Sequence, residues 1–286
     1  PKALSTIVIV GPTASGKTKK SIEIAKKYNA EVICADSRIV YKGFDIASAK
    51  PTPEEREGVV HHLIDITEPT KLFSAGDFAL HASAAMEDIQ SRGKNVIISG
   101  GTWFYITALL GAEKLPEIPQ NPTLREGLSL KSSKELLDML KSLDPKRAEL
   151  IHVNNKDKII RSIEMCKFLN TPISEHEREK NTPSGAIWYA IDTERDELYS
   201  RIDARVDLMF EQGLVWEFEK LMAKYGENEV ISNTIGYREL VDYKNHNEAK
   251  DKIKQHTRNF AKRQLSWLSG NSDIRLIGLD EEIEIS

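Results

Sequence analysis

Short runs of apolar residues alternate along this chain with longer stretches in which apolar residues recur every three or four positions. Runs rich in Val and Ile and bounded by Gly, Ser or Asp are typical of strands buried on both faces of a parallel sheet. Such runs cover residues 6–10, 31–35, 95–99 and 186–191. Helical periodicity covers residues 18–28, 78–91, 194–225 (with a break at Gly213) and 247–268. This alternation predicts a doubly wound α/β fold, in which ligands bind beyond the carboxyl ends of the strands.

The alternation stops near residue 112. The stretch LPEIPQNP has three prolines within eight residues, which is typical of a linker. Two helical patterns follow, at 134–143 and 156–169, before a strand pattern resumes at residue 186. We therefore expect the first part of an α/β core over 1–112, a helical insertion over 113–184, and the second part of the core, with basic C-terminal helices, over 185–286.

The composition is that of a soluble globular protein, with 40% hydrophobic and 29% charged residues. The two cysteines lie far apart, and no apolar run approaches the length of a membrane span. We therefore expect a cytoplasmic protein that uses no membrane. The net charge of −4 argues weakly against a nucleic-acid partner. However, six Lys or Arg residues stand against one acid in residues 250–263, so one helix is locally basic.

The stretch GPTASGKT matches the phosphate-binding pattern G-x-x-x-x-G-K-[ST] between a predicted strand and a predicted helix. Backbone N–H groups in such a loop bind phosphate at the helix N-terminus. Lys17 would add a positive charge, and the Thr18 hydroxyl would bind Mg²⁺. The expected phosphate-binding residues are Gly11, Pro12, Thr13, Ala14, Ser15, Gly16, Lys17 and Thr18. The pattern does not decide between ATP and another phosphorylated compound.

Two polar segments follow the second and third predicted strands. Asp36 comes directly after the second strand, whereas the third ends in SGGT without an acid. An ordinary nucleoside triphosphatase places its magnesium-binding carboxylate at the end of a later strand. Asp36 is therefore the acid expected to face the phosphates, as a metal ligand, a general base or a cap of the following turn. Thr102, which ends SGGT, adds a hydroxyl at the same edge.

Two further patterns each allow two interpretations. Arg201 and Arg205 are four residues apart, so one helix face presents both guanidinium groups, either to a diphosphate or to neighbouring aspartates. The helix around AKRQ combines Lys262 and Arg263 with aromatic residues. That combination suits the phosphate backbone of a nucleic acid, but it also occurs on solvated helices with aromatic residues in the core.

These motifs, in this order, resemble the bacterial tRNA dimethylallyltransferases over about residues 5–270. The resemblance rests on GPTASGKT, DSRIVYKGFDIASAKP, HHLID, ISGGTWFY, GLVWEFEKL, IGYREL and TRNFAKRQLSW. It implies a P-loop kinase-like parallel sheet with a helical insertion. It also implies transfer of the dimethylallyl group from dimethylallyl diphosphate to N6 of the adenosine 3′-adjacent to the tRNA anticodon, with diphosphate as the other product.

The resemblance also implies roles for individual residues. Asp36 corresponds to the general base, Thr102 to a hydroxyl that contacts the adenosine, and Arg205 to an arginine on the diphosphate. Mg²⁺ is the implied cofactor, and the tRNA anticodon stem-loop is the implied partner of a monomeric enzyme. The implied tRNA-binding residues are Asp36, Ser37, Arg38, Ile39, Thr102, Arg125, Asp157, Lys158, Ile159, Ile160, Arg161, Lys262 and Arg263.

Three other functions stay open on the sequence. A small-molecule kinase would hold ATP in the loop and use Asp36 as the base on a substrate hydroxyl. An adenylate isopentenyltransferase would prenylate a free nucleotide, which needs neither the insertion nor the basic helix. A non-catalytic RNA-binding protein would have no common use for Asp36, Thr102 and Arg205.

Overall fold

The computed structural model describes residues 4–111, 118–175, 185–271 and 273–284. The chain divides into a core unit, residues 1–111 and 182–286, and a helical unit, residues 112–181. The boundaries expected at 112/113 and 184/185 lie outside the described residues.

The core unit contains one six-stranded sheet with the strand order β3-β2-β4-β1-β5-β6. All of its strand pairs are parallel, which confirms the predicted fold class. The strands are β1 (Thr6–Val10), β2 (Ala30–Cys34), β3 (His61–His62), β4 (Asn95–Gly100), β5 (Ala186–Ile191) and β6 (Arg275–Ile277). The four longer strands were predicted. The sequence analysis missed β3 and β6, because runs of two and three residues carry no detectable period.

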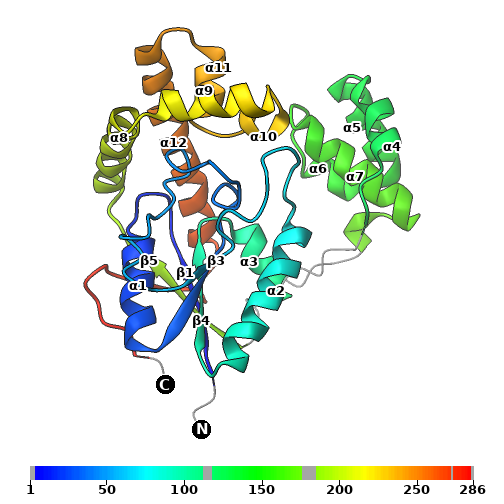
Figure 1. Cartoon of the computed structure of the whole chain (residues 1–286). Coiled ribbons are helices and arrows are strands. Elements are labelled where there is room, and N and C mark those ends of the chain that lie inside the picture. The colour runs from blue at the N-terminus through cyan, green and yellow to red at the C-terminus, as the bar shows by residue number, and fades with distance from the viewer. Residues whose placement is uncertain (1–3, 112–117, 176–184, 272, 285–286) are drawn as a thin grey trace. The chain divides into compact units, whose positions relative to one another are not determined.

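Both faces of the sheet are covered, which explains why its strands are apolar throughout. On β1, Ile7 and Ile9 pack in one cluster with Ile24 of α1 (Lys17–Lys27), and all three are buried. Val8 and Val10 alternate with them and are fully buried on the opposite face. Figure 1 shows α1 on one side of the sheet and α2 with α3 on the other. The phosphate loop between β1 and α1 therefore lies at the carboxyl edge of a central strand.

The other helices of the core unit are α2 (Ala75–Ser91), α3 (Trp103–Leu110), α8 (Arg195–Glu211), α9 (Leu214–Tyr225), α10 (Glu229–Ser232), α11 (Tyr237–Asp242) and α12 (His246–Ser269). Helix α2 begins three residues before the predicted start, because Ser74 and Asp77 form a capping box. Gly213, with φ of 99°, separates α8 from α9 as the sequence predicted.

A buried carboxylate holds the segment that follows Asp36. Glu217 of α9 is 7% exposed, and its two oxygens accept the backbone N–H groups of Asp45, Ile46 and Ala47 and the hydroxyl of Tyr237. Four donors compensate for the burial of this charge. Glu217 therefore holds the FDIASAKP segment to helices α9 and α11. The sequence analysis did not explain the role of this segment.

The helical unit has its own apolar core. Its elements are α4 (Pro122–Ser129), α5 (Ser133–Leu143), α6 (Pro145–Glu149), α7 (Lys156–Leu169) and a 3-10 turn, η1 (Ile173–Glu175). Leu136 and Leu140 of α5 pack in one cluster with Ile159 and Ile163 of α7, and all four are fully buried. These two helices are the ones that the periodicity predicted, because each has one continuous apolar face.

Candidate active site

Two glycines shape the phosphate loop. Gly16 caps the N-terminus of α1 with φ of 93°, a left-handed conformation that favours glycine. A Cβ atom on Gly11 would lie 2.8 Å from the Ser15 Oγ atom. The loop therefore follows a path that side chains at these two positions would obstruct.

Lys17 carries a positive charge that its surroundings destabilise. Its Nζ atom donates a hydrogen bond to the Pro12 carbonyl at 2.6 Å. Burial, and secondly the nearby Arg205 guanidinium, lowers the pKa of Lys17 to about 7, although the negative charge of Asp36 partly opposes this shift. A negative charge in the loop would stabilise the protonated form of Lys17 and offset its repulsion from Arg205, so the electrostatics of the site favour an anionic ligand.

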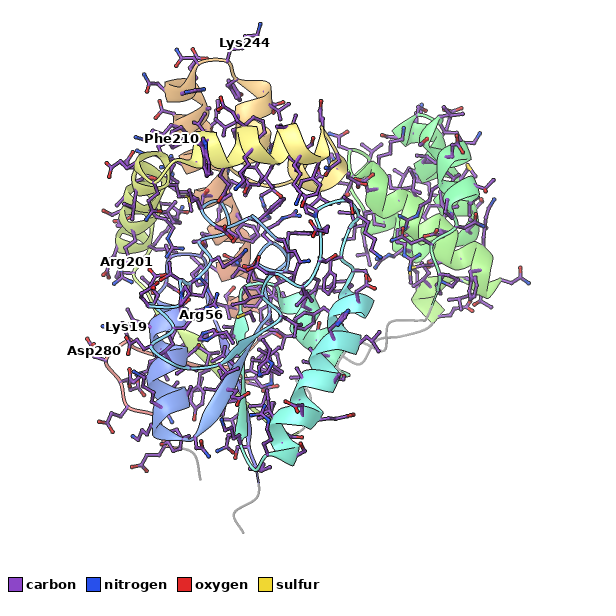
Figure 2. The ribbon with its side chains drawn as sticks, viewed as in Figure 1. Lys19, Arg56, Arg201, Phe210, Lys244 and Asp280 are labelled. Atoms are coloured by element: carbon purple, nitrogen blue, oxygen red, sulfur yellow. The ribbon has the colours of Figure 1, made fainter. Side chains whose placement is uncertain are left out.

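Arg205 reaches the phosphate loop from α8. Its Nη1 atom lies 3.5 Å from the Thr13 Oγ1 atom, and burial lowers the pKa of its guanidinium. Arg201, labelled in Figure 2, instead pairs with Glu197 one turn earlier in the same helix, at 2.5 Å. The two arginines therefore differ: Arg205 reaches the phosphate loop, and Arg201 forms an ordinary helical ion pair.

Asp36 caps a turn but keeps one oxygen unbonded. Its Oδ1 atom accepts the backbone N–H groups of Arg38 at 2.7 Å and Ile39 at 3.3 Å. Its Oδ2 atom accepts no hydrogen bond from the part of the chain that the structure describes. The capping interpretation is therefore correct for one oxygen, and the other is available to a proton or a metal ion.

The SGGT segment lies directly against the end of β2. A Cβ atom on Gly100 would lie 2.0 Å from the Ala35 carbonyl oxygen, so only glycine fits there. Beyond it, the Thr102 N–H donates to the same carbonyl at 3.2 Å. The Thr102 hydroxyl accepts the Ser37 N–H at 3.3 Å. These contacts bring Thr102 next to Asp36, as the shared sheet edge predicted.

Gln264 of α12 joins two parts of the site, and the sequence analysis gave it no role of its own. Its side chain is 3% exposed, accepts the Thr13 N–H at 2.9 Å and donates to the Gly101 carbonyl at 3.1 Å. A Cβ atom on Gly101 would lie 2.3 Å from the amide nitrogen of Gln264. Gln264 thus fixes the phosphate loop relative to SGGT. A glutamine inside a basic helix gives no sign of this role, because only burial reveals it.

Of the six Lys and Arg residues of α12, three pair with α8, two are exposed, and Lys252 donates a hydrogen bond to Gln255 of the same helix. Lys250 and Lys254 pair with Asp207 of α8, and Arg258 pairs with Asp203. These pairs link the two helices and explain the aspartates beside the arginine pair. Lys262 and Arg263 are exposed and form no ion pair with any described residue. These two residues offer two adjacent exposed cations to a ligand.

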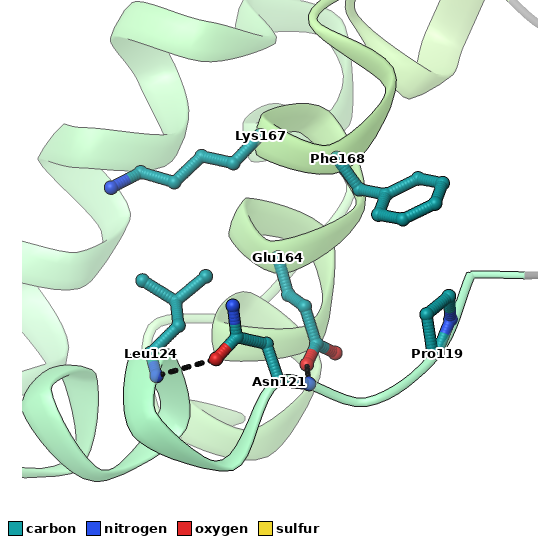
Figure 3. A pocket seen from close by; sticks show the side chains of 6 residues that line it. All are labelled: Pro119, Asn121, Leu124, Glu164, Lys167 and Phe168. Atoms are coloured by element: carbon teal, nitrogen blue, oxygen red, sulfur yellow. Dashed lines mark hydrogen bonds between the residues drawn. The ribbon is translucent and has the colours of Figure 1, made fainter.

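The helical unit presents two of its predicted tRNA-binding arginines around a buried acid. Arg125 and Arg161 both pair with Glu164, whose side chain is 2% exposed. Glu164 also lines a cavity of about 270 Å³, whose other lining residues, shown in Figure 3, are Pro119, Asn121, Leu124, Lys167 and Phe168. Both arginines remain about one-third exposed, so their guanidinium groups can still meet a phosphate.

One part of the predicted tRNA surface is wrong for side-chain contact. Ile159 is fully buried and Ile160 is 8% exposed, because both belong to the apolar face of α7 that forms the core of the helical unit. Asp157 and Lys158, on the opposite face, are exposed. Within the implied five-residue segment, Ile159 and Ile160 therefore support the core, and the side chains of Asp157, Lys158 and Arg161 are the ones that RNA could reach.

The parallel sheet and the glycine-rich loop, with cations at its carboxyl edge, define a P-loop-like α/β protein. The family model for IPP transferases matches residues 39–271, and the chain belongs to this family, as its motifs indicated. A tRNA dimethylallyltransferase of Acetivibrio thermocellus is 41% identical over 97% of this chain and 92% of its own length. One of Exiguobacterium sibiricum is 43% identical over 93% of this chain and 87% of its own length.

Solved structures agree with this assignment. The tRNA isopentenylpyrophosphate transferase of Bacillus halodurans has a TM-score of 0.71 and is 37% identical, covering 98% of this chain and 92% of its own. A eukaryotic dimethylallyltransferase, described as acting on tRNA, has a TM-score of 0.82 and is 27% identical, covering 97% of this chain and 74% of its own. Among the described residues, no helix is long and apolar enough to cross a membrane.

Proposed function

We propose that this protein transfers the dimethylallyl group of dimethylallyl diphosphate to N6 of the adenosine 3′-adjacent to the anticodon of tRNA. The family and the names of its relatives support this reaction. The observation that carries it in the structure is the arrangement around the phosphate loop. Lys17 and Arg205 lie there near the Asp36 carboxylate, which has one oxygen without a hydrogen bond, and strand β4 does not end in an acidic residue.

The loop would hold a diphosphate that leaves rather than a phosphate that is transferred. When the bond between the allylic carbon and its oxygen breaks, negative charge grows on the departing diphosphate. Lys17, Arg205 and the backbone amides at the start of α1 would stabilise that charge because they are already in place. In this step the bond electrons stay with the diphosphate, and the adenine nitrogen supplies the pair for the new bond to carbon.

Asp36 would remove the proton from that nitrogen. The lone pair of an exocyclic adenine amine is delocalised into the ring, so a base that takes up the proton assists attack. The Oδ2 atom is available for this purpose, while Oδ1 fixes the orientation of the carboxylate through two backbone N–H groups. The Thr102 hydroxyl accepts the N–H group of Ser37, the residue after Asp36, and would contact the extruded adenosine.

The loop fits Mg²⁺ only in combination with a bound diphosphate. The described residues contain no group of three or more His, Cys, Asp or Glu side chains that could hold a metal. The Ser15 hydroxyl is buried without a partner among them, and Thr18 is an exposed residue in the first turn of α1. Hydroxyl and phosphate oxygens are ligands that Mg²⁺ prefers. When bound, the ion would offset charge on the leaving diphosphate.

The tRNA would be bound through its phosphates by exposed cations of both units. Lys262 and Arg263 serve in the core unit, and Lys158, Arg125 and Arg161 serve in the helical unit. The relatives are named for action on tRNA, which favours this acceptor over a small metabolite or free adenylate.

A transfer assay separates the three enzymatic possibilities. Protein is mixed with Mg²⁺ and dimethylallyl diphosphate labelled in the prenyl group, and then with unmodified tRNA or with AMP. We expect label on the adenosine 3′-adjacent to the anticodon, and none on AMP. A parallel mixture with ATP labelled in the γ-phosphate tests for kinase activity. Label on AMP, or phosphoryl transfer from ATP to a metabolite, would contradict the proposal.

A further inference from the structure

A short segment after β6 crosses helix α1 and reaches the phosphate loop. We call residues 278–283 the strap. In Figure 1 it is the red segment that passes the blue helix α1, and Figure 2 shows its Asp280 on the same side of the core unit as Lys19. The Tyr28 hydroxyl donates to the Ile283 carbonyl at 2.6 Å, and Lys27 pairs with Glu282 at 2.9 Å. The strap is thus fastened to the far end of α1.

A buried lysine fastens the strap closer to the loop. Lys20 lies one turn after Lys17 in α1, and its side chain is 1% exposed. Its Nζ atom donates to the carbonyls of Leu279 at 3.0 Å and Glu281 at 2.6 Å, and to the Glu23 carboxylate at 3.0 Å. An ammonium group has three donors, so all of them are used. A buried charge needs such compensation, which makes this lysine a specific attachment for the strap.

Leu279 then contacts the loop itself. A Cβ atom built on Gly16 would lie 2.7 Å from the Leu279 Cδ2 atom, so the leucine side chain fills the space beside this glycine. Gly16 is the residue whose left-handed conformation starts α1. Glycine adopts many backbone conformations, and a neighbouring side chain restricts the choice.

We infer that Leu279 and Lys20 are positioning residues for the phosphate loop. Leu279 restricts Gly16 from outside the site, and Lys20 holds Leu279 in place through its carbonyl. The amide groups at the start of α1 then keep the orientation that a diphosphate requires, and fixed donors bind better than donors that must be ordered. The inference rests on the proposed function only in taking the ligand to be a diphosphate.

Inorganic diphosphate with Mg²⁺, titrated calorimetrically into the full chain, tests the inference directly. We expect Leu279→Ala to weaken binding about tenfold, which corresponds to ~1.4 kcal/mol. Leu279→Met, which fills a similar volume, should restore most of the affinity. Lys20→Met should weaken binding in the same direction, because it releases the Leu279 carbonyl.

Ile283→Ala is the matched control. Ile283 lies in the same strap, is 3% exposed and packs in the apolar cluster of the sheet, whereas the described side chain nearest to Gly16 is that of Leu279. It should lower thermal stability at least as much as Leu279→Ala while leaving the affinity for diphosphate unchanged. Equal affinities in all variants, or equal losses in both alanine variants, would overturn the inference.

Two further outcomes are distinguishable. If Leu279→Ala does not fold, Leu279→Val against Ile283→Val makes the same comparison with smaller cavities. If diphosphate affinity responds as expected but no prenyl group reaches tRNA, the positioning role stands and the proposed reaction fails.

Discussion

The two edges of the sheet differ in how buried charges are compensated. At the amino edge, the Glu31 carboxylate of β2 is 2% exposed and accepts hydrogen bonds from Arg92, Lys94 and His62. The Arg92 guanidinium, more than the other partners, holds the pKa of Glu31 well below its usual range. The charge on this carboxylate is fully compensated within the protein.

At the carboxyl edge, Lys17 and Arg205 form no ion pair with any carboxylate of the described residues. Burial lowers the pKa of both groups. The comparison shows that the same fold compensates charge at one edge and leaves it uncompensated at the other, where we propose that a diphosphate binds. Substitutions at the carboxyl edge should therefore change binding and catalysis, and those at the amino edge should change stability.

The largest effect is expected at Asp36. Asp36→Ala should lower prenyl transfer to tRNA by about 10²–10⁴-fold through loss of the base, with diphosphate binding retained. Asp36→Asn is the matched variant, because its amide oxygen can still accept the N–H groups of Arg38 and Ile39. Single-turnover assays on both should show the same loss. Near-normal transfer by Asp36→Asn would leave Asp36 with its capping role only.

Loss of a cation at the loop should come next. Lys17→Met should reduce the transfer rate by about 10²–10³-fold, the typical cost of removing one preorganised donor. Lys26→Met, which removes an exposed lysine near the end of the same helix, should leave the rate unchanged. A similar loss in both variants would show that the effect comes from disturbance of α1.

The low pKa of Lys17 gives this prediction a pH dependence. Because its folded pKa of about 7 lies below the unfolded value of about 10.4, the unfolded chain binds more protons between these limits. Stability without ligand should therefore rise with pH across that range, relative to Lys17→Met. Diphosphate binding should do the opposite and weaken above pH 7, because Lys17 must then take up a proton. If the difference in stability between wild type and Lys17→Met did not change with pH, the lowered pKa of Lys17 would be contradicted.

At the amino edge the expected effect is on stability alone. Glu31→Gln removes a buried carboxylate from three partners. We expect the free energy of unfolding, measured with urea, to fall by about 2 kcal/mol, which is less than for a fully buried ion pair because water reaches Arg92 and Lys94. Since the folded pKa of Glu31 is depressed, its stabilisation is present above the unfolded pKa of about 4.3 and is lost as pH falls below it. Transfer activity of the folded variant should be normal; a loss of activity would contradict the division between the edges.

The smallest effect concerns tRNA. The double variant Lys262→Ala with Arg263→Ala should bind tRNA with a weaker salt dependence, because fewer counterions are released. The slope of log K against log salt concentration should become shallower by about one for each cation removed. Lys250→Ala with Lys254→Ala is the matched control in the same helix, since both lysines already pair with Asp207. Filter binding at several salt concentrations measures both slopes. Equal slopes in the two double variants would place the RNA surface elsewhere.

Local signals predicted the elements that are long or repetitive enough to carry a period. The apolar run at 186–191 coincides with β5, and the pattern at 156–169 coincides with α7. The two-residue strand β3 and the three-residue strand β6 were missed because neighbouring strands, rather than their own composition, hold them in the sheet.

The amino-acid sequence by itself determined the parallel α/β core, the phosphate loop and the motifs of the family, because apolar runs, helical periodicity and glycine spacing are local patterns that the residue types carry directly. Only the tertiary structure decided that Arg205 faces the loop while Arg201 does not, that Gln264 joins the loop to SGGT, and that Ile159 supports a core. It also brought Leu279 to Gly16 across more than 260 residues. These contacts depend on which helix packs where, so burial and charge compensation arise from the assembled chain and have no counterpart in any single segment.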